Sequence, residues 1–326
     1  MDFDSSTSLW LVGSGPMAQA YAAVLKAQSV EYKVIGRGKN SADAFEKETG
    51  VPVVCGGLDA ALADLASPHQ AIVVVGVEQL APVARKLIGA GCKRLLLEKP
   101  GALRFAELKS VHALAELYGA KVFIAYNRRF YASVQRLRQL VDAEGGIISA
   151  VFEFTEWSHR LRDLQKAPGV KEHWLLANST HVIDLAFHFL GLPKEGKWQG
   201  WHGGSLDWHP ASARFHGAGV TERGIPFAYQ ADWEAPGRWG VELLTRHNRY
   251  LLRPMEALQV IPLGSVEPQP VDLDNTLDLQ FKPGLYRQCE AFLSPHIDCG
   301  LKQQLCSLQE QLDVFPIYSR MAGYAL

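Results

Sequence analysis

The stretch Leu9-Trp10-Leu11-Val12-Gly13-Ser14-Gly15-Pro16-Met17-Ala18 decides the fold of this chain. Its four apolar residues predict a buried strand, and the residues after it, Ala20–Ala27, continue as a helix. In such a strand–turn–helix, G-x-G-x-x-A binds a dinucleotide: the first glycine permits the tight turn, the second lets the backbone approach a pyrophosphate, and the small third residue lets helix pack on strand. The stretch therefore predicts a nucleotide-binding domain, with cofactor contacts from Gly13, Ser14, Gly15, Pro16 and Met17.

A second informative stretch, Glu98-Lys99-Pro100, follows another apolar run, Leu95–Leu97. The carboxyl ends of strands line the ligand crevice of an open parallel sheet, so Lys99 is expected at that edge. A solvated surface lysine is the alternative, but Pro100 biases the residue before it towards extended backbone. An ammonium at this edge can orient a reacting hydroxyl or carbonyl and stabilise negative charge that develops on its oxygen.

The alternation of apolar runs and helical patterns from Leu9 to Tyr126 predicts repeated βαβ units and a parallel sheet. After Gly145 the pattern changes to strands separated by turn residues, which predicts an antiparallel sheet. The expected fold class is α/β plus α+β: a Rossmann doubly wound parallel sheet in residues 1–126, then a large, mainly antiparallel open sheet in residues 127–326. Two helices are expected in the second part, Ser179–Leu190 and Leu301–Ala322, and the last one is expected to pack back on the first domain.

The turn after the second strand, Tyr32–Ile35, indicates which dinucleotide is bound. NAD-binding sites usually carry an acid there for the ribose 2′-hydroxyl. This chain has Arg37, Lys39 and Ser41 instead, two cations and a hydroxyl suited to a 2′-phosphate. A solvated basic turn is the alternative interpretation, but NADP is predicted, with NAD as the weaker candidate.

Four pieces of the chain resemble the Gfo/Idh/MocA family of nicotinamide-dependent sugar and polyol oxidoreductases. They are Val12–Ala18, Glu98–Pro100, Ala125–Phe130 and His181–Leu185. The resemblance implies an enzyme that moves a hydride between the nicotinamide of NADP and a carbinol or carbonyl carbon of a sugar, nucleotide-sugar or polyol. A polysaccharide or nucleotide-sugar biosynthetic branch of the family is one candidate.

The resemblance also implies roles for individual residues. Lys99 is the catalytic lysine, in contact with cofactor and substrate, and His181 is the proton-transfer residue. Asp184 holds a substrate hydroxyl. Further contacts to the cofactor come from Gly76, Val77, Glu98 and Asn127, although Val75–Gln79 departs from the family's Thr-Pro-x-x-His.

The expected helix carries His181, Asp184 and His188 at spacings that place them on one face. Such a face suits satisfied core polar groups, an active-site wall or, last in rank, a metal site, and no metal is predicted. The family pattern D-x-x-x-H is broken, because Ala177 stands where the aspartate is expected. Either Asn178 or Asp184 compensates, or catalysis depends more on Lys99, or the chain is a non-catalytic NADP-binding sensor. Redox-assisted glycoside cleavage is a third alternative.

Substrate recognition is expected from Arg and Trp residues, because an indole stacks on the apolar face of a sugar and a guanidinium binds hydroxyls, carboxylates or phosphates. For any single residue, a solvated loop is at least as common an explanation. The candidates in this sequence are Arg128, Arg129, Arg160, Asn178, Trp157–Arg162 and His173–Trp174.

Composition excludes several classes of partner. With 326 residues and a net charge of −1, the chain has no basic field for nucleic acid or an anionic membrane. The polar N-terminus, Met1–Ser6, does not resemble a signal peptide, and no apolar stretch approaches the roughly 20 residues of a membrane helix. Five cysteines without a C-x-x-C pair indicate reduced thiols and a cytoplasmic protein. A homo-oligomer, dimer or tetramer, is expected through the antiparallel sheet near Trp198, Trp201, Trp208 and Trp233.

Overall fold

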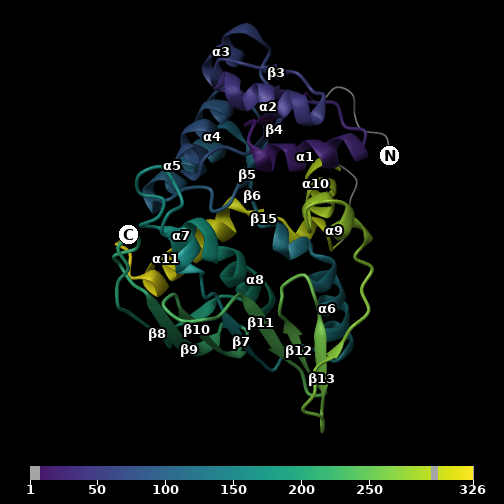
Figure 1. Cartoon of the computed structure of the whole chain (residues 1–326), viewed down its shortest axis with the longest axis vertical. Helices are drawn as coiled ribbons and strands as arrows, with labels where there is room; N and C mark the ends of the chain where they lie inside the picture. Colours follow the sequence, from purple (N-terminus) through teal and green to yellow (C-terminus); the bar gives the residue numbers. More distant parts are fainter. Residues whose placement is uncertain (1–7, 295–299, 326) are drawn as a thin grey trace. The chain divides into compact units, whose positions relative to one another are not determined.

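The computed structural model describes residues 8–294 and 300–325, which form two compact units (Figure 1). The first unit runs to Ala125 and includes Leu285–Asp313, and the second comprises Tyr126–Gly284 and the residues from Val314 onwards. The polar N-terminal segment Met1–Ser6 and Cys299 lie outside the described residues.

The first unit is built on a seven-stranded sheet with the order β15-β6-β5-β4-β1-β2-β3. All its strand pairs are parallel except that of β15 with β6. Every residue of β1 is buried, as expected for a parallel strand with both faces covered. The predicted doubly wound sheet is therefore confirmed. Its strands are β1 (Leu9–Val12), β2 (Lys33–Ile35), β3 (Val53–Val54), β4 (Gln70–Val73), β5 (Arg94–Glu98), β6 (Lys121–Ala125) and β15 (Cys306–Ser307).

Helices connect these strands. Helix α1 packs against α2 and α10, and α4 packs against α5. Strand β1 pairs with β2 on one side and β4 on the other, so the chain changes direction across the sheet at β1. Ligands of open α/β sheets bind beside such a switch point, at the carboxyl ends of the strands. The helices are α1 (Pro16–Ala27), α2 (Lys39–Thr49), α3 (Gly57–Asp64), α4 (Leu80–Gly89), α5 (Phe105–Tyr118) and α10 (Leu285–Leu293), with short 3-10 helices η1 (Val77–Gln79) and η4 (Lys302–Gln304).

The second unit is built on an eight-stranded sheet with the order β14-β13-β12-β11-β7-β10-β9-β8. Only the β7–β10 pair is parallel, so the mainly antiparallel sheet is confirmed. The strands are β7 (Ser149–Glu153), β8 (Pro193–Gly203), β9 (Arg214–Thr221), β10 (Pro226–Asp232), β11 (Gly240–Leu244), β12 (Asn248–Leu252), β13 (Gln259–Pro262) and β14 (Gln269–Pro270).

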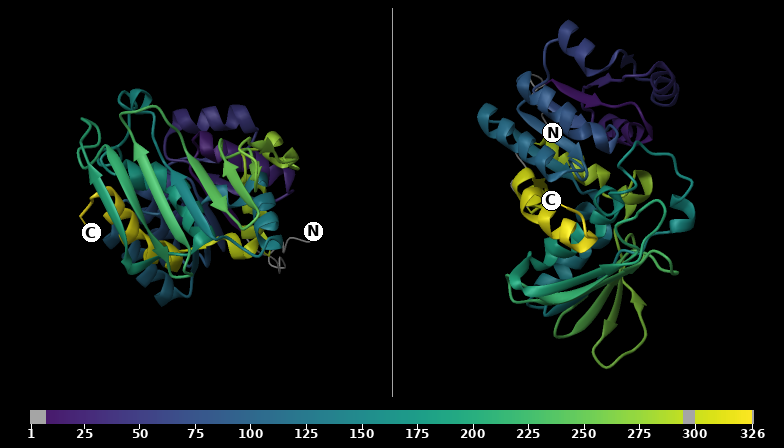
Figure 2. Two further views of the ribbon diagram at one scale, coloured as in Figure 1. Left: turned by 90° about the horizontal axis from the view of Figure 1, so that it is seen from below. Right: turned by 90° about the vertical axis from the view of Figure 1, so that its left-hand side faces the viewer.

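Helices α6 (Ala132–Ala143) and α8 (Thr180–Leu190) contact this sheet. The left view of Figure 2 shows the sheet from the opposite side, where its strands lie uncovered among the described residues. The other helical segments are α7 (Ser158–Leu161), α9 (Thr276–Gln280), the 3-10 helix η2 (Asn127–Phe130) and a π-helical turn, η3 (Leu175–Ser179).

The last helix is shorter than the predicted Leu301–Ala322. Helix α11 (Leu308–Ala322) begins after η4 and β15, because Cys306 and Ser307 pair with β6. Its first residues belong to the first unit and those from Val314 to the second.

The tryptophans expected at a subunit interface are mostly core residues. Trp198, Trp208 and Trp233 are buried, and Trp208 stacks on Trp233 with ring centroids 5.6 Å apart. Trp201 is 55% exposed. The expectation of a four-tryptophan surface is therefore wrong, because three of these rings fill the interior of the second unit.

The described cysteines are free thiols: Cys92, Cys289 and Cys306 are buried and Cys55 is exposed. Burial raises the pKa of the Cys92 thiol to about 12, which makes it unreactive. Within residues 8–294 and 300–325, no helix has the length and hydropathy to cross a bilayer.

Candidate functional site

The turn after β1 shows why two of its positions are glycine. Gly13 has a φ of +125°, and a Cβ there would lie 2.3 Å from the backbone oxygen of Val74. Gly15 has an ordinary φ of −86° at the start of α1, and a Cβ there would meet nothing within 4 Å. Gly13 thus permits the approach of two strand ends, whereas Gly15 leaves open space beside a helix N-terminus. That space fits the pyrophosphate of a dinucleotide.

A cleft of about 580 Å³ opens at this turn, within the first unit. It lies at the carboxyl ends of β1 and β4, the switch point of the sheet. Six of the predicted cofactor residues line it: Gly13, Ser14, Gly15, Arg37, Ser41 and Gly76. The Ser14 hydroxyl donates to Ser41 Oγ at 3.0 Å, which ties the first turn to the turn after β2.

Charged side chains line the cleft as well. The stem of Arg37 packs against the Cα of Gly57, since a Cβ there would lie 3.7 Å from Arg37 Cγ. The ammonium of Lys86 donates to both carboxylate oxygens of Asp59, at 2.7 and 2.6 Å. Asp59 and Lys86 could not be predicted from the sequence, because they come from α3 and α4 and no motif marks them.

Pro16, Met17, Lys39 and Val77 do not line this cleft. Lys39 is exposed at the first position of α2. Of the two predicted cations, only Arg37 therefore faces the cleft.

Two other predicted cofactor residues are engaged elsewhere. The hydroxyl of Tyr21 in α1 donates to Glu98 Oε1 at 3.1 Å. Burial and the neighbouring Glu98 carboxylate hold the pKa of Tyr21 well above its usual value, so this hydroxyl remains a donor. The amide of Asn127, in the second unit, is buried and donates to the carbonyl oxygen of Pro283 at 2.9 Å.

Lys99 follows the last residue of β5, as the sequence predicts, and is half-buried. The peptide bond between Lys99 and Pro100 is cis. The carbonyl of Pro100 accepts a hydrogen bond from Gln311 Nε2 at 3.0 Å, so α11 anchors the residue next to Lys99.

In the second unit, His181 is near the start of α8 and is buried between two aromatic rings. Its ring centroid lies 6.1 Å from that of Tyr126 and 6.1 Å from that of Trp239. The rest of α8 is buried too, except for the intermediate His188. The predicted polar face of this helix is therefore not a solvent-exposed face.

Arg129 and Asp184 bind each other. Arg129 Nε donates to Asp184 Oδ2 at 2.9 Å and Nη2 donates to Oδ1 at 2.6 Å. Both side chains are almost fully buried, at 4% and 3% exposure. The two substrate ligands expected from the sequence thus form a forked ion pair inside the unit.

The carboxylate missing at Ala177 has a counterpart on another element. Glu156, after β7, is 2% exposed and accepts hydrogen bonds from Asn178 Nδ2 at 2.9 Å and from Ser179 Oγ at 2.8 Å. These donors lie in η3, which leads directly into α8. Asn178 therefore connects a buried carboxylate to the helix that carries His181.

His188 binds Arg138, with 2.8 Å between its Nε2 and Arg138 Nη2. Burial, together with Arg129 and Arg138, lowers its pKa well below the usual value, so it is neutral. Among the described residues, no group of three His, Cys, Asp or Glu side chains is arranged to hold a metal ion.

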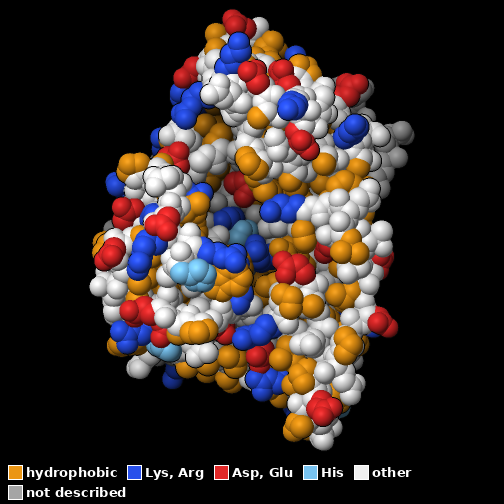
Figure 3. Space-filling view, viewed as in Figure 1, with side chains coloured by type: hydrophobic (Ala, Val, Ile, Leu, Met, Phe, Trp, Pro, Cys, Tyr) orange, Lys and Arg blue, Asp and Glu red, His pale blue; other side chains and the backbone are white. Residues whose placement is uncertain are grey.

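Arginines and tryptophans alternate in a row beside His181. The row runs Arg160, Trp157, Arg238, Trp239 and Arg128, with successive guanidinium carbons and ring centroids 4.5, 4.7, 4.4 and 4.6 Å apart. Arg160 was predicted as a substrate ligand, and Arg128 and Trp157 were candidates, but Arg238 and Trp239 were missed. Lys, Arg and His side chains gather near α7 on the face shown in Figure 3.

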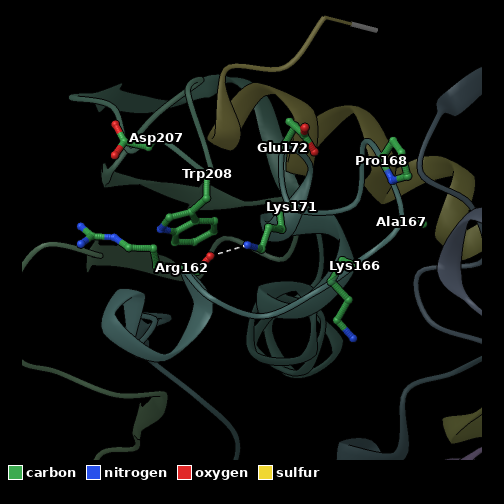
Figure 4. A pocket seen from close by; sticks show the side chains of 8 residues that line it. All are labelled: Arg162, Lys166, Ala167, Pro168, Lys171, Glu172, Asp207 and Trp208. Carbon is green, nitrogen blue, oxygen red and sulfur yellow. Dashed lines mark hydrogen bonds between the residues drawn. The ribbon is translucent and has the colours of Figure 1, made fainter.

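A smaller pocket of about 330 Å³ lies nearby in sequence, lined in part by Arg162, Lys171 and Trp208. In Figure 4 the Lys171 ammonium points to the backbone oxygen of Arg162, at 2.6 Å. The pocket also carries Glu172 and Asp207, so its charges are mixed. None of the residues of the Arg–Trp row lines it.

Comparison with known proteins agrees with this description. Residues 8–126 match the family model described as oxidoreductase family, NAD-binding Rossmann fold (GFO_IDH_MocA). No curated protein matches the chain by sequence.

Solved structures of sugar and nucleotide-sugar dehydrogenases share the fold over nearly the whole chain. The UDP-N-acetylglucosamine 3-dehydrogenase GnnA from Acidithiobacillus ferrooxidans is 15% identical, with a TM-score of 0.72 over 97% of this chain and 96% of that one. The WlbA dehydrogenase from Bordetella pertussis, in complex with NADH and UDP-GlcNAcA, is 13% identical (TM-score 0.75, 98% and 96%). Levoglucosan dehydrogenase, in complex with NADH and L-sorbose, is 16% identical (TM-score 0.73, 97% and 96%).

The Rossmann sheet, its glycine turn and the matched residues define an oxidoreductase with an NAD(P)-binding domain. This domain, residues 8–126, matches the model of the Gfo/Idh/MocA family of oxidoreductases.

Proposed function

We propose that this protein is an NADP-dependent oxidoreductase that transfers a hydride between nicotinamide and a carbinol or carbonyl carbon of a sugar, nucleotide-sugar or polyol. The open cleft beside Gly15 at the sheet's switch point carries the proposal, because its shape and position fit a dinucleotide. The names of structural neighbours, which act on or bind UDP-sugars and L-sorbose, support the substrate class.

A bound nicotinamide supplies the hydride donor or acceptor. The protein then needs a group that polarises the reacting oxygen and a group that exchanges its proton. We assign the first role to the Lys99 ammonium and the second to the His181 imidazole, since histidine exchanges protons near neutral pH. Asn178 acts as a positioning residue, because it joins the buried Glu156 carboxylate to the turn that begins the His181 helix.

Substitution of Lys99 tests these roles. On a substrate found by screening sugars and nucleotide-sugars, Lys99→Ala lowers kcat by about 100- to 1000-fold, the usual loss for one transition-state contact. The control is Lys93→Ala. Lys93 directly precedes β5, at the end opposite to Lys99, and its ammonium donates to the carbonyl oxygen of Tyr118. Full turnover by a pure Lys99→Ala protein contradicts the assignment.

The preference for NADP rests on the turn after β2. Arg37 and Ser41 line the cleft and no acid follows the strand, so a 2′-phosphate would gain charge-assisted hydrogen bonds there. We expect NADPH to bind at least about tenfold more tightly than NADH at low salt, the equivalent of about 1.4 kcal/mol. Arg37→Ala should reduce this ratio, mainly by weakening NADPH.

Nicotinamide fluorescence titrations of both cofactors measure the ratio. Asp59→Asn is a matched variant, because its carboxylate lines the same cleft and is held by Lys86. A preference for NADH that Asp59→Asn abolishes refutes the assignment to Arg37 and gives the ribose contact to Asp59.

A second candidate function is a non-catalytic, NADP-binding sensor, favoured by Ala177 in place of the family aspartate. Tight cofactor binding with no turnover on any screened sugar or nucleotide-sugar supports the sensor. Turnover that depends on both Lys99 and His181 excludes it.

A further inference from the structure

The Arg–Trp row, defined above as Arg160, Trp157, Arg238, Trp239 and Arg128, has the composition of an anion site. Its tryptophans are not free platforms for a neutral sugar ring, because guanidinium groups lie over both indoles at 4.4 to 4.7 Å. The indole N–H of Trp157 is used by the carbonyl of Gly237, at 3.0 Å. What the row presents to a ligand is therefore mainly its guanidinium groups.

Donors at the inner end of the row lack partners. Nε of Arg128 and Nε1 of Trp239 are both buried without a hydrogen-bond partner among the described residues. A buried donor left unpaired is destabilising, so such groups usually meet a ligand or water. Two unpaired donors on adjacent side chains favour a ligand that carries several oxygen acceptors.

The carboxylates near the row leave it positively charged. Glu156 lies 3.6 Å from Arg238 and is already bound by Asn178 and Ser179. Glu256, in the turn between β12 and β13, acts electrostatically on Arg128. The row thus carries three guanidinium charges, and the two carboxylates named here, Glu156 and Glu256, offset only part of them. Arg129 is not part of this set, because Asp184 neutralises it.

The row also has a direction. Its outer members, Arg160, Trp157 and Arg238, are exposed, whereas Trp239 is buried and its ring lies 6.1 Å from that of His181. A ligand bound along the row would extend from solvent towards the histidine assigned to proton transfer.

We propose that Arg128 and Arg238, on either side of Trp239 in the row, bind an anionic group of the substrate: an oxyanion of the carboxylate or phosphate type. Arginine suits this role, because its planar fork donates two parallel hydrogen bonds to such groups. The substrate is then an acidic sugar or a nucleotide-sugar, not a neutral sugar or polyol. This inference deepens the proposed function and rests on it for the fate of the bound molecule, but not for binding.

Titration calorimetry with three probes tests the inference and separates the two anion sources. D-Glucose is the neutral probe, D-glucuronate adds a carboxylate and UDP-glucose adds a diphosphate. At least one anionic probe should bind about tenfold or more tightly than glucose, and high salt should reduce this advantage. If only glucuronate binds more tightly than glucose, the subsite recognises a carboxylate. If only UDP-glucose does so, the subsite recognises a diphosphate.

Variants identify the residues responsible. Arg128→Gln and Arg238→Gln should each remove most of the advantage of the anionic probe. Arg249→Gln, a partly exposed arginine paired with Glu242 on the same sheet, should leave it unchanged. If Arg128→Gln does not fold, the exposed Arg238 still provides the test.

Three results would overturn the inference: equal binding of glucose and the anionic probes, an unchanged advantage in Arg238→Gln, or no binding of any probe. Binding and turnover fail separately. An anionic probe that binds through Arg238 and is never oxidised contradicts the proposed function and leaves this inference standing. Turnover of neutral sugars that is unchanged in Arg238→Gln supports the proposed function and contradicts this inference.

Discussion

Gly13 and Gly15 are two residues apart in one turn, but a side chain would meet very different surroundings at the two positions. At Gly13 the backbone is left-handed and the carbonyl of Val74 occupies the place of a side chain. At Gly15 the space is open and the backbone is ordinary. The structure therefore requires glycine at Gly13, whereas at Gly15 we expect the open space to serve cofactor binding.

Two alanine variants separate these roles. Gly13→Ala should lower the stability of the cofactor-free protein by more than about 1 kcal/mol, because alanine must adopt a positive φ and clash with backbone. Gly15→Ala should unfold as the unmodified protein does, but bind NAD(P)H about tenfold or more weakly. Thermal unfolding and nicotinamide fluorescence measure both effects. Equal loss of stability in the two variants contradicts this division.

The ion pair of Arg129 with Asp184 is a structural feature of the second unit. Each charge is almost fully buried, so either one left alone has no water to solvate it. The two residues that the sequence predicts as substrate ligands, Arg129 and Asp184, thus bind each other in the folded unit.

Removing one partner should be costly. Asp184→Asn should destabilise the protein by about 3–5 kcal/mol, since it removes the carboxylate charge that the buried Arg129 guanidinium binds. The double variant Arg129→Met/Asp184→Leu should recover part of that loss, because both charges of the pair are removed together. Urea unfolding provides the comparison. A rise in KM with unchanged stability would instead return Asp184 to substrate binding.

At the scale of elements, Glu144 joins helix α6 to the β11–β12 hairpin. It follows the last residue of α6 and accepts hydrogen bonds from Asn248 at 2.6 Å, from Tyr250 at 2.5 Å and from Thr245. Partial desolvation alone would raise the pKa of Glu144, but these three hydrogen bonds together outweigh it and lower the pKa below its usual 4.5. Ionised Glu144 is therefore the form that stabilises this connection.

The sign of the pH dependence follows from that shift. A carboxyl group with a lowered pKa in the folded state adds stability above its unfolded pKa, and the stability is lost as the pH falls through the folded value. Glu144→Gln should therefore be less stable than the unmodified protein at pH 7, and the gap should narrow below about pH 4.5. Urea midpoints at several pH values measure it. Asp142→Asn, an exposed neighbour, is the control and should show no such gap.

At the scale of the whole molecule, the uncovered face of the second unit's sheet suits contact with another copy of the chain. Val151 and Trp201 lie on it, 38% and 55% exposed. The register places Trp201 opposite His216 of β9, in a row across neighbouring strands. We therefore propose that this face forms a subunit interface.

Light scattering at micromolar concentration should give a mass two or four times that of the 36.0 kDa chain. Trp201→Glu should shift the mass towards one chain, because a buried charge opposes association. Leu263→Glu changes an equally apolar, 84% exposed residue outside the strands and should leave the mass unchanged. A mass of one chain for the unmodified protein would refute the proposal.

Local periodicity was enough to predict much of this fold. The fully apolar run Leu9–Val12 has the bounds expected from its pattern, and the predicted helix Ser179–Leu190 differs from α8 by one residue at its start. Buried parallel strands are continuous apolar runs, so their signal does not depend on the rest of the chain. Strands β8 and β9 were not predicted, because their sequences lack such an apolar run. Most residues of β8 are exposed, and both strands contain glycines, which are uncommon inside strands.

The features of the candidate site likewise fall into those that the local sequence predicts and those that it does not. The glycine turn and the place of Lys99 after β5 could be predicted, because backbone geometry imposes them locally. The partners of charged side chains could not, because they come from elements distant in sequence: Asp184 for Arg129, Glu156 for Asn178, Lys86 for Asp59. Burial makes each charge require a partner, but only the packed fold determines which residue supplies it.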